Sequence, residues 1–198
     1  MSRLPDPAKR RDLLAGVRAY MIRNGVADLS LRPLARHLGT SDRMLLYYFG
    51  TKERMVTDAL AMYEGRPLLR AQSLLDTDGS PKNPAELRRF LEDTWQQFSN
   101  PDLRATLPLY LEILAAGLLH PVRYGPVVRD VMSEWTRLLT SVFRDLGMTE
   151  ARARTEASLL VDASFGLLLA PLTDGDWDQA DTAFHALLDH LEPGWLGT

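Results

Sequence analysis

The stretch Ser30–Lys52 constrains the fold more than any other part of this chain. Leu31 and Leu34 open an apolar pattern with helical spacing, which predicts a short helix with one buried face. Ser30 lies where its hydroxyl oxygen would accept a backbone N–H at the start of this helix. Gly39 follows the last apolar residue, at a position where a left-handed residue commonly ends a helix.

A second short helix is predicted directly after this turn. Ser41 can cap its start, and Leu45 and Phe49 give it one buried side. Two short helices joined by a tight turn that contains glycine form the layout of a helix-turn-helix. In DNA-binding proteins with this layout the second helix lies in the major groove. We therefore predict that the helix Asp42–Phe49 reads DNA.

The charge of the chain is unevenly distributed. Its net charge is −3, but residues 1–54 carry +6 and the remainder carries −9. A basic N-terminal third on an acidic body is typical of a protein that binds a polyanion, although ordinary fluctuation of surface charge gives the same pattern. The coincidence with the helix-turn-helix pattern favours the first interpretation.

The composition excludes several other classes of protein. The chain has no cysteine, which excludes disulfide frameworks and thiolate metal sites and fits a reducing cytosol. No apolar run reaches about 18 residues, so we expect no transmembrane helix and no membrane partner. The N-terminal residues carry charge without a continuous apolar core, so we expect no secretory signal.

Helical periodicity and turn residues predict an all-α protein without strands. The predicted helices are Asp6-Pro7 to Asn24-Gly25, the two helices above, Lys52 to about Tyr63, Leu68–Leu75, Ala85–Ser99, Leu103–Leu119, Val127–Leu146, Thr149–Leu169 and a last one from Asp176 to Pro193-Gly194. Asp6, Thr51, Thr149 and Asp176 are the expected caps of four of them. Thr77–Pro84 is the clearest linker. We expect Leu103–Leu119 to be a buried helix, with a kink at Pro108.

The N-terminal third resembles the tetracycline-repressor (TetR) family of bacterial transcription regulators. The residues that carry the resemblance are Gly25, Leu29-Ser30-Leu31, Leu34-Ala35, Leu38-Gly39-Thr40-Ser41, Leu45, Tyr47, Phe49 and Lys52-Glu53. They span less than a quarter of the chain, and the body shares only the helical layout. The resemblance implies a three-helix DNA-binding domain over residues 1–52, joined to a larger helical effector-binding and dimerisation domain over 53–198.

The function implied by this resemblance is that of a ligand-responsive transcriptional repressor in the bacterial cytoplasm, associated with the nucleoid. Its expected partners are a palindromic double-stranded DNA operator, a second copy bound through the last two long helices, and an unidentified small-molecule effector that releases the DNA. We expect no enzymatic activity, no cofactor and no bound metal. The chain has no Gly-rich phosphate loop and no HExxH motif. The alternatives are a small helical ligand carrier or enzyme with an incidental basic N-terminus, and a nonspecific DNA binder.

The DNA-contacting positions of the family can be transferred one at a time. They are Ser30, Arg32, Thr40, Ser41, Asp42, Arg43, Met44, Tyr47, Tyr48 and Lys52. Arginine can bond guanine bidentately, and a lysine beside a helix N-terminus suits phosphate. The sequence departs from the family at Arg43-Met44-Leu45-Leu46, where many members have Gly-Thr-Leu-Tyr. Met44 and Leu46 could contact thymine methyl groups or pack against the other helices.

Residues of the body that could line an effector pocket are aromatic or acidic. We select Trp95, Phe98, Tyr110, Glu112, Tyr124, Trp135, Asp162 and Phe165. Each aromatic residue also fits the core of a helical body. Glu112 and Asp162 lie in apolar helices, where a carboxylate must hold a ligand, pair with an arginine such as Arg104 or Arg137, or reach solvent.

Three polar residues of the last helix have a spacing that metal ligands can share. Asp181, His185 and Asp189 recur every four residues and would lie along one face. The same spacing is common on solvated helices, and we favour that interpretation.

Overall fold

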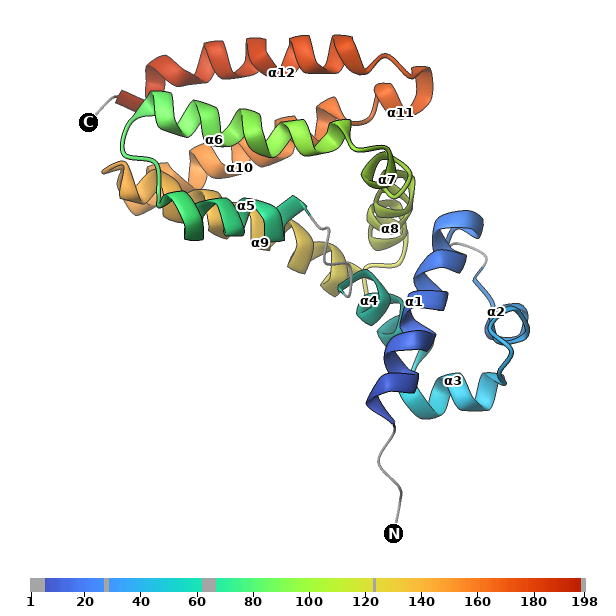
Figure 1. Ribbon diagram of the computed structural model, residues 1–198. Coiled ribbons are helices and arrows are strands. Elements are labelled where there is room, and N and C mark those ends of the chain that lie inside the picture. The colour runs from blue at the N-terminus through green and yellow to red at the C-terminus, as the bar shows by residue number, and fades with distance from the viewer. Residues whose placement is uncertain (1–5, 27–28, 62–66, 123, 197–198) are drawn as a thin grey trace. The chain divides into compact units, whose positions relative to one another are not determined.

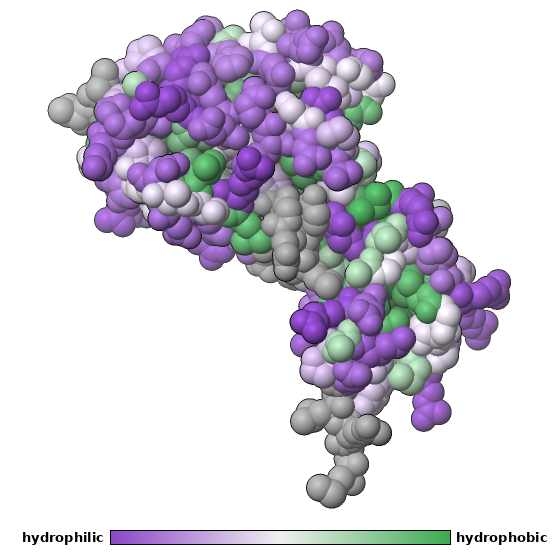
Figure 2. All heavy atoms as spheres, in the orientation of Figure 1, coloured by the Kyte–Doolittle hydropathy of each residue, from purple (hydrophilic) through white to green (hydrophobic). Residues whose placement is uncertain are grey.

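A computed structural model describes the chain except for residues 1–5, 27–28, 62–66, 123 and 197–198. The described residues form helices and no strand, which confirms the predicted all-α class (Figure 1). The chain divides into two compact units. The first unit comprises Met1–Glu64 and Ala105–Val128, and the second comprises Gly65–Arg104 and Arg129–Thr198. In Figure 2 hydrophilic residues cover most of the visible face, and hydrophobic residues form small separate patches.

The first unit contains the helix-turn-helix. Its helices are α1 (Pro7–Asn24), α2 (Leu31–His37), α3 (Asp42–Phe49), α4 (Lys52–Ala61) and α8 (Leu107–Leu119). One hydrophobic core holds them together, with Val17 and Met21 from α1, Leu34 from α2, Leu45 from α3 and Met55 from α4 all fully buried. Leu34 and Leu45, which belong to the helical pattern seen in the sequence, therefore help to pack the three N-terminal helices against α4.

The helix α8 belongs to the first unit, although it lies far along the chain. Leu109 and Ile113 of α8 are buried in the same core as the helix-turn-helix. The domain predicted over 53–198 includes this helix, because nothing in the helix's own pattern shows which partner covers its apolar face. The compact unit therefore does not end at residue 52, while the functional division at that residue stays a prediction.

The second unit consists of antiparallel and crossing helices around a core of its own. Its elements are α5 (Pro67–Asp78), α6 (Pro84–Gln96), η1 (Gln97–Ser99), α7 (Pro101–Arg104), residues 129–145 of α9 (Gly125–Asp145), α10 (Glu150–Leu167), α11 (Pro171–Asp174), α12 (Trp177–Leu191) and η2 (Glu192–Leu196). Leu87 of α6, Phe143 of α9, Leu160 of α10 and Leu188 of α12 are fully buried. The helix α12 packs against α10, and Figure 1 shows it running beside α6.

Most of the predicted caps at helix starts are confirmed. The side chains of Asp6, Thr51, Thr149 and Asp176 each accept a backbone N–H near the start of a helix. The prediction for Ser30 is wrong: it precedes α2 in extended conformation, but its side chain makes no capping hydrogen bond. Its exposed hydroxyl therefore has no part in starting α2.

Two further predictions about the body need correction. The expected helix Leu103–Leu119 is two helices, α7 and α8, and Pro108 lies in the first turn of α8 instead of kinking it. A proline is tolerated in the first turn because the N–H that it lacks has no partner within the helix there. This helix was also expected to be buried all round, whereas Leu118 and Leu119 are exposed. The linker is shorter than predicted, because α5 extends to Asp78 and α6 begins at Pro84.

One helical stretch has the length and apolar composition that a membrane span requires. Glu150–Asp174 meets both criteria, and 28% of its most apolar window is buried. The core helices of soluble proteins meet the same criteria, so this stretch does not assign the chain to a membrane. The large apolar residues exposed in this stretch are Leu159 on α10 and Leu169 just after it.

Candidate nucleic-acid interface

The helix α3 has one buried and one exposed face. Leu45 is fully buried and Phe49 nearly so, which anchors α3 in the core of the first unit. Arg43 and Tyr47 lie on the opposite side of the helix and are exposed. A guanidinium and a phenol on a rigid, anchored helix can reach the base edges of a groove without any change in the fold.

The turn between α2 and α3 is fixed by backbone hydrogen bonds. Gly39 has φ +62°, in the left-handed region. The N–H of Thr40 donates to the carbonyl of Ala35 at 2.9 Å, which closes the last turn of α2. The hydroxyl oxygen of Ser41 accepts the N–H of Met44 at 3.1 Å and thereby caps α3. The Ser41 hydroxyl proton remains a donor suited to a phosphate oxygen.

Arg32 and Asp42 lie side by side at the starts of α2 and α3. The Nε of Arg32 is 4.0 Å from Oδ2 of Asp42, and both side chains are exposed. The other oxygen of Asp42 accepts the N–H of Arg43 at 2.9 Å. An exposed ion pair of this kind stabilises a protein by about 0–1 kcal/mol, so Arg32 can exchange Asp42 for a phosphate at little cost.

Lys52 and Tyr48 both make contacts within the first unit. The ammonium of Lys52 donates to the backbone carbonyl of Leu29, so the start of α4 is attached to the segment before α2. Tyr48 is half-buried, and its ring contacts the rings of Tyr47 and Phe49. An ammonium has three donors, so a lysine that bonds a carbonyl can also contact a phosphate. Its predicted phosphate contact stays a prediction.

Glu112 of α8 contacts the backbone at the end of α1. Its Oε2 accepts the N–H of Val26 at 2.7 Å. Gly25, the preceding residue, has φ +75° and ψ −175°, and a Cβ atom built there would lie 2.8 Å from the same oxygen. The sequence leaves Glu112 as a pocket residue, an arginine partner or an exposed group at a helix end. The hydrogen bond to Val26 shows a carboxylate that holds the segment after α1, and its place in an effector pocket stays a prediction.

The predicted effector residues, Glu112 included, are divided between the two units. Tyr110, Glu112 and Tyr124 belong to the first unit, whereas Trp95, Phe98, Trp135, Asp162 and Phe165 belong to the second. Asp162 is exposed on α10, in agreement with the solvent alternative. Arg104 donates to the carbonyl of Phe98 at 2.5 Å and stacks on Trp177, with 3.9 Å from Cζ to the ring centroid, so its guanidinium is used within the second unit.

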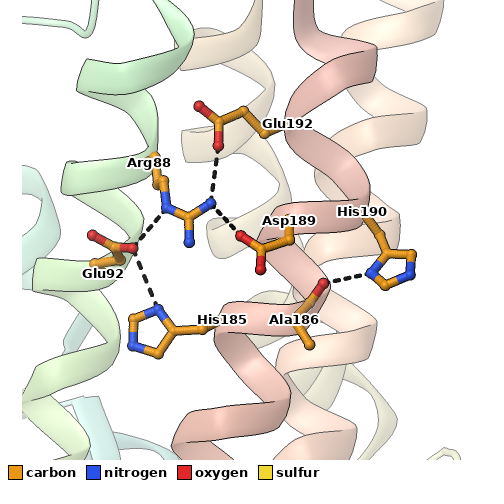
Figure 3. A network of polar contacts seen from close by, with 7 residues as sticks. All are labelled: Arg88, Glu92, His185, Ala186, Asp189, His190 and Glu192. Carbon is orange, nitrogen blue, oxygen red and sulfur yellow. Dashed lines mark hydrogen bonds and ion pairs between the residues drawn. The ribbon is translucent and has the colours of Figure 1, made fainter.

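A network of charged side chains joins α6 to α12 (Figure 3). Arg88 of α6 donates to Glu92 at 2.8 Å, to Asp189 at 2.7 Å and to Glu192 at 2.9 Å. His185 lies 3.3 Å from the same oxygen of Glu92. These hydrogen bonds, with that to Glu192 the largest cause, raise the pKa of Arg88 above its ordinary value. Arg88 is therefore a cation held among three carboxylates.

Trp95 continues this contact between α6 and α12. Its indole N–H donates to Asp181 at 2.6 Å, and its ring stacks on Phe184 with 4.3 Å between centroids. Asp181, His185 and Asp189 therefore each contact a different residue of α6, and their regular spacing follows the register of two packed helices. Within the described part of the chain, no three such side chains are grouped to hold a metal ion.

No family model and no curated protein matches this sequence. Solved structures with a similar fold are known. They include a transcriptional regulator from Rhodococcus sp. Rha1 (18% identical, TM-score 0.72, covering 93% of this chain and 96% of that one). A second is a transcriptional regulator from Pseudomonas aeruginosa PAO1 (23%, TM-score 0.70, covering 98% and 94%). A third is a TetR-family transcriptional regulator from Rhodococcus sp. (15%, TM-score 0.68, covering 93% and 99%). This chain therefore has the fold of the TetR-family transcriptional regulators.

Proposed function

We propose that this protein is a DNA-binding transcriptional regulator and not an enzyme. The observation that carries the proposal is α3, a helix anchored by Leu45 and Phe49 that presents Arg43 and Tyr47 outward. The net charge of +6 over residues 1–54 supports it, because phosphate contacts supply much of the affinity for DNA. The three structural neighbours are all described as transcriptional regulators, and that likeness of fold agrees with the proposal.

The proposed active species is a homodimer on a palindromic operator. One eight-residue recognition helix offers few base contacts, and two half-sites about 34–36 Å apart supply a specific site. The surface of α10 supports dimerisation because Leu159 is exposed on it, and Leu169, two residues after its end, is exposed as well. Gly166, between them, has open space around it, so a second helix can approach closely. The proposal places α10 and α12 of two copies in one four-helix interface.

The proposed regulation is repression that a small-molecule effector relieves. The likeness of fold supports this part, and the predicted effector residues remain its candidates. The mechanism is a population shift, in which the effector favours a conformation whose recognition helices no longer match two half-sites. If a panel of cationic and hydroxylated aromatic compounds leaves the anisotropy of a preformed protein–operator complex unchanged, this part of the proposal fails.

The central test is a fluorescence-anisotropy titration of the full chain. The probe is duplex DNA from immediately upstream of the gene that encodes the chain, and the control is a scrambled duplex of equal length and composition. We expect the upstream duplex to bind at least tenfold more tightly at moderate salt. Arg43→Ala should reduce this preference, whereas Arg89→Ala, at an exposed position of the second unit, should leave it unchanged. Equal binding of both duplexes would contradict the proposal and favour a nonspecific DNA binder. Absence of binding to either duplex would favour a helical ligand carrier or enzyme.

Dimerisation has a separate test. Analytical ultracentrifugation should show a dimer at micromolar concentration, and Leu159→Lys should shift it to monomer while circular dichroism remains unchanged. Ser141→Lys, on an exposed position of α9, is the control that should leave the dimer intact. A wild-type chain that sediments as a monomer at all concentrations would contradict the proposed interface.

A further inference from the structure

The reading face of α3 is unusually apolar. Met44 is 40% exposed and Leu46 is 41% exposed, while Leu45 between them is 0% exposed. A surface helix of a globular protein normally carries polar residues opposite its buried side. Here two large apolar side chains flank the outward position of Tyr47, and Arg43 is the adjacent cation. Leu45 and Phe49 supply the buried side of α3 in the core, and Met44 and Leu46 do not belong to that core.

The major groove of DNA offers one apolar group that such side chains can cover. Among the base edges exposed there, thymine alone carries a methyl group, at C5, while the other groups are hydrogen-bond donors and acceptors. Thioether and isobutyl side chains cannot satisfy donors or acceptors, so against any other base they would leave polar groups without water. Covering a methyl group instead removes apolar surface on both partners.

The position of both residues in α3 suits this contact. The N-terminal residues of a recognition helix reach the base edges. Met44 lies in the first turn after the Ser41 cap, and Leu46 lies in the second. Arg43 lies next to Met44 and is exposed, so a guanine is the base that fits beside the methyl-bearing one.

We propose that Met44 and Leu46 determine operator specificity by covering thymine methyl groups next to a guanine bound by Arg43. The inference rests on the proposed function and goes beyond it by naming what the half-site must present. It also explains the departure from the family pattern, since a threonine and a tyrosine with hydroxyl groups are replaced here by side chains that read methyl groups. The occupant of this apolar face is therefore DNA and not a protein partner.

The experiment removes the methyl group and nothing else from the bases. The full chain first selects duplexes from a pool with random central positions, and the selected sequence is then synthesised with deoxyuridine in place of thymidine at one position at a time. Deoxyuridine pairs like thymidine but lacks the C5 methyl. We expect one or two positions per half-site at which affinity falls about fourfold, which corresponds to the transfer of one CH₂-sized group, about 0.8 kcal/mol. Replacement at the remaining thymines should change affinity less than twofold.

A double-mutant cycle assigns the methyl group to its side chain. In Met44→Ala and Leu46→Ala the penalty for deoxyuridine should disappear at the position that each side chain covers and persist at the other. Both residues are exposed, so unchanged melting curves are expected and serve as the folding control. An Arg43→Ala variant should lose its preference for guanine while it keeps the methyl penalty.

The outcomes separate the two proposals. If no sequence is enriched in the selection, the proposed function fails. If a sequence is enriched and deoxyuridine has no effect at any position, the proposed function stands and the methyl readout is overturned. The methyl readout is also overturned if the penalty persists in both alanine variants, or if these variants change the oligomeric state and not the response to deoxyuridine.

Discussion

Gly25 has a backbone conformation that other residues avoid. Its φ of +75° and ψ of −175° lie in a region occupied almost only by glycine, and the Glu112 carboxylate lies where a side chain would begin. Gly25→Ala should therefore lower the free energy of unfolding by roughly 1–3 kcal/mol. Gly39→Ala is the matched control, because Gly39 also has positive φ but has open space around it and should cost about 1–2 kcal/mol.

Urea unfolding of the two variants measures the difference. Gly25→Ala should be the less stable variant, because it adds a steric contact with Glu112 to the backbone strain. Equal destabilisation of both would show that Glu112 moves away freely and does not fix the end of α1.

Contacts between residues that are close in the sequence could be predicted from it. Contacts between residues that are far apart in the sequence could not. Asp6 and Thr51 cap their helices as predicted, because a cap depends on residues two or three positions away. Glu112 contacts Val26 across 86 positions, and no local pattern shows that partner. The same applies to Asp181. The sequence shows its regular spacing with His185 and Asp189, but it does not show that Trp95 is its hydrogen-bond partner.

At the scale of elements, the contact between α6 and α12 depends on one cation. Arg88→Met should destabilise the second unit by roughly 1–3 kcal/mol, because Glu92, Asp189 and Glu192 would lose their common partner while remaining close together. Arg89→Met, at the exposed neighbouring position, should change stability by less than about 0.5 kcal/mol. Differential scanning calorimetry of both variants provides the comparison, and a similar small effect of both would mean that the network is solvated.

The start of α6 is held by hydrogen bonds of Glu86 and Asn83, and one of them depends on pH. Glu86 accepts the N–H of Lys82 at 2.8 Å, and its own N–H donates to Asn83 at 2.9 Å. The hydrogen bond from Lys82 is the largest cause that lowers the pKa of Glu86 from its ordinary value of 4.5. A carboxylate with a lowered pKa in the folded state stabilises the protein above its unfolded pKa and ceases to do so as the pH falls through its folded pKa.

The variant Glu86→Gln tests the direction in which the stability contributed by Glu86 changes with pH. The wild type should be the more stable protein near neutral pH, and the difference should close as the pH falls below 4.5. Urea unfolding at a series of pH values measures it, with Asn83→Ala as a second variant that keeps the carboxylate. A difference that widens on acidification would contradict the assigned cause.

At the scale of the whole molecule, the uneven charge predicts a steep salt dependence of DNA binding. The logarithm of the binding constant should fall linearly with the logarithm of salt concentration, by about 0.9 per phosphate contacted. Lys52→Ala should reduce the slope by about 2 for a dimer, one contact per subunit. Lys82→Ala, an exposed lysine of the second unit, should leave the slope unchanged.

The salt slope distinguishes two roles of Lys52. Its ammonium donates to the carbonyl of Leu29, so a loss of affinity alone could arise from a displaced α2. A displaced helix weakens binding at every salt concentration and leaves the slope of the remaining contacts nearly the same. Anisotropy titrations at four or more salt concentrations decide between these roles, and an unchanged slope in Lys52→Ala would remove its predicted phosphate contact.

The inclusion of α8 in the first unit limits how this protein can be recombined with others. Leu109 and Ile113 close the core around the helix-turn-helix, and Glu112 holds the end of α1. A chimaera that transplants only residues 1–64 onto a foreign body would leave that core open on one side. A transplanted helix-turn-helix must therefore either carry α8 along or retain its three contacts, so sequence changes in α8 are constrained by the core of the N-terminal helices.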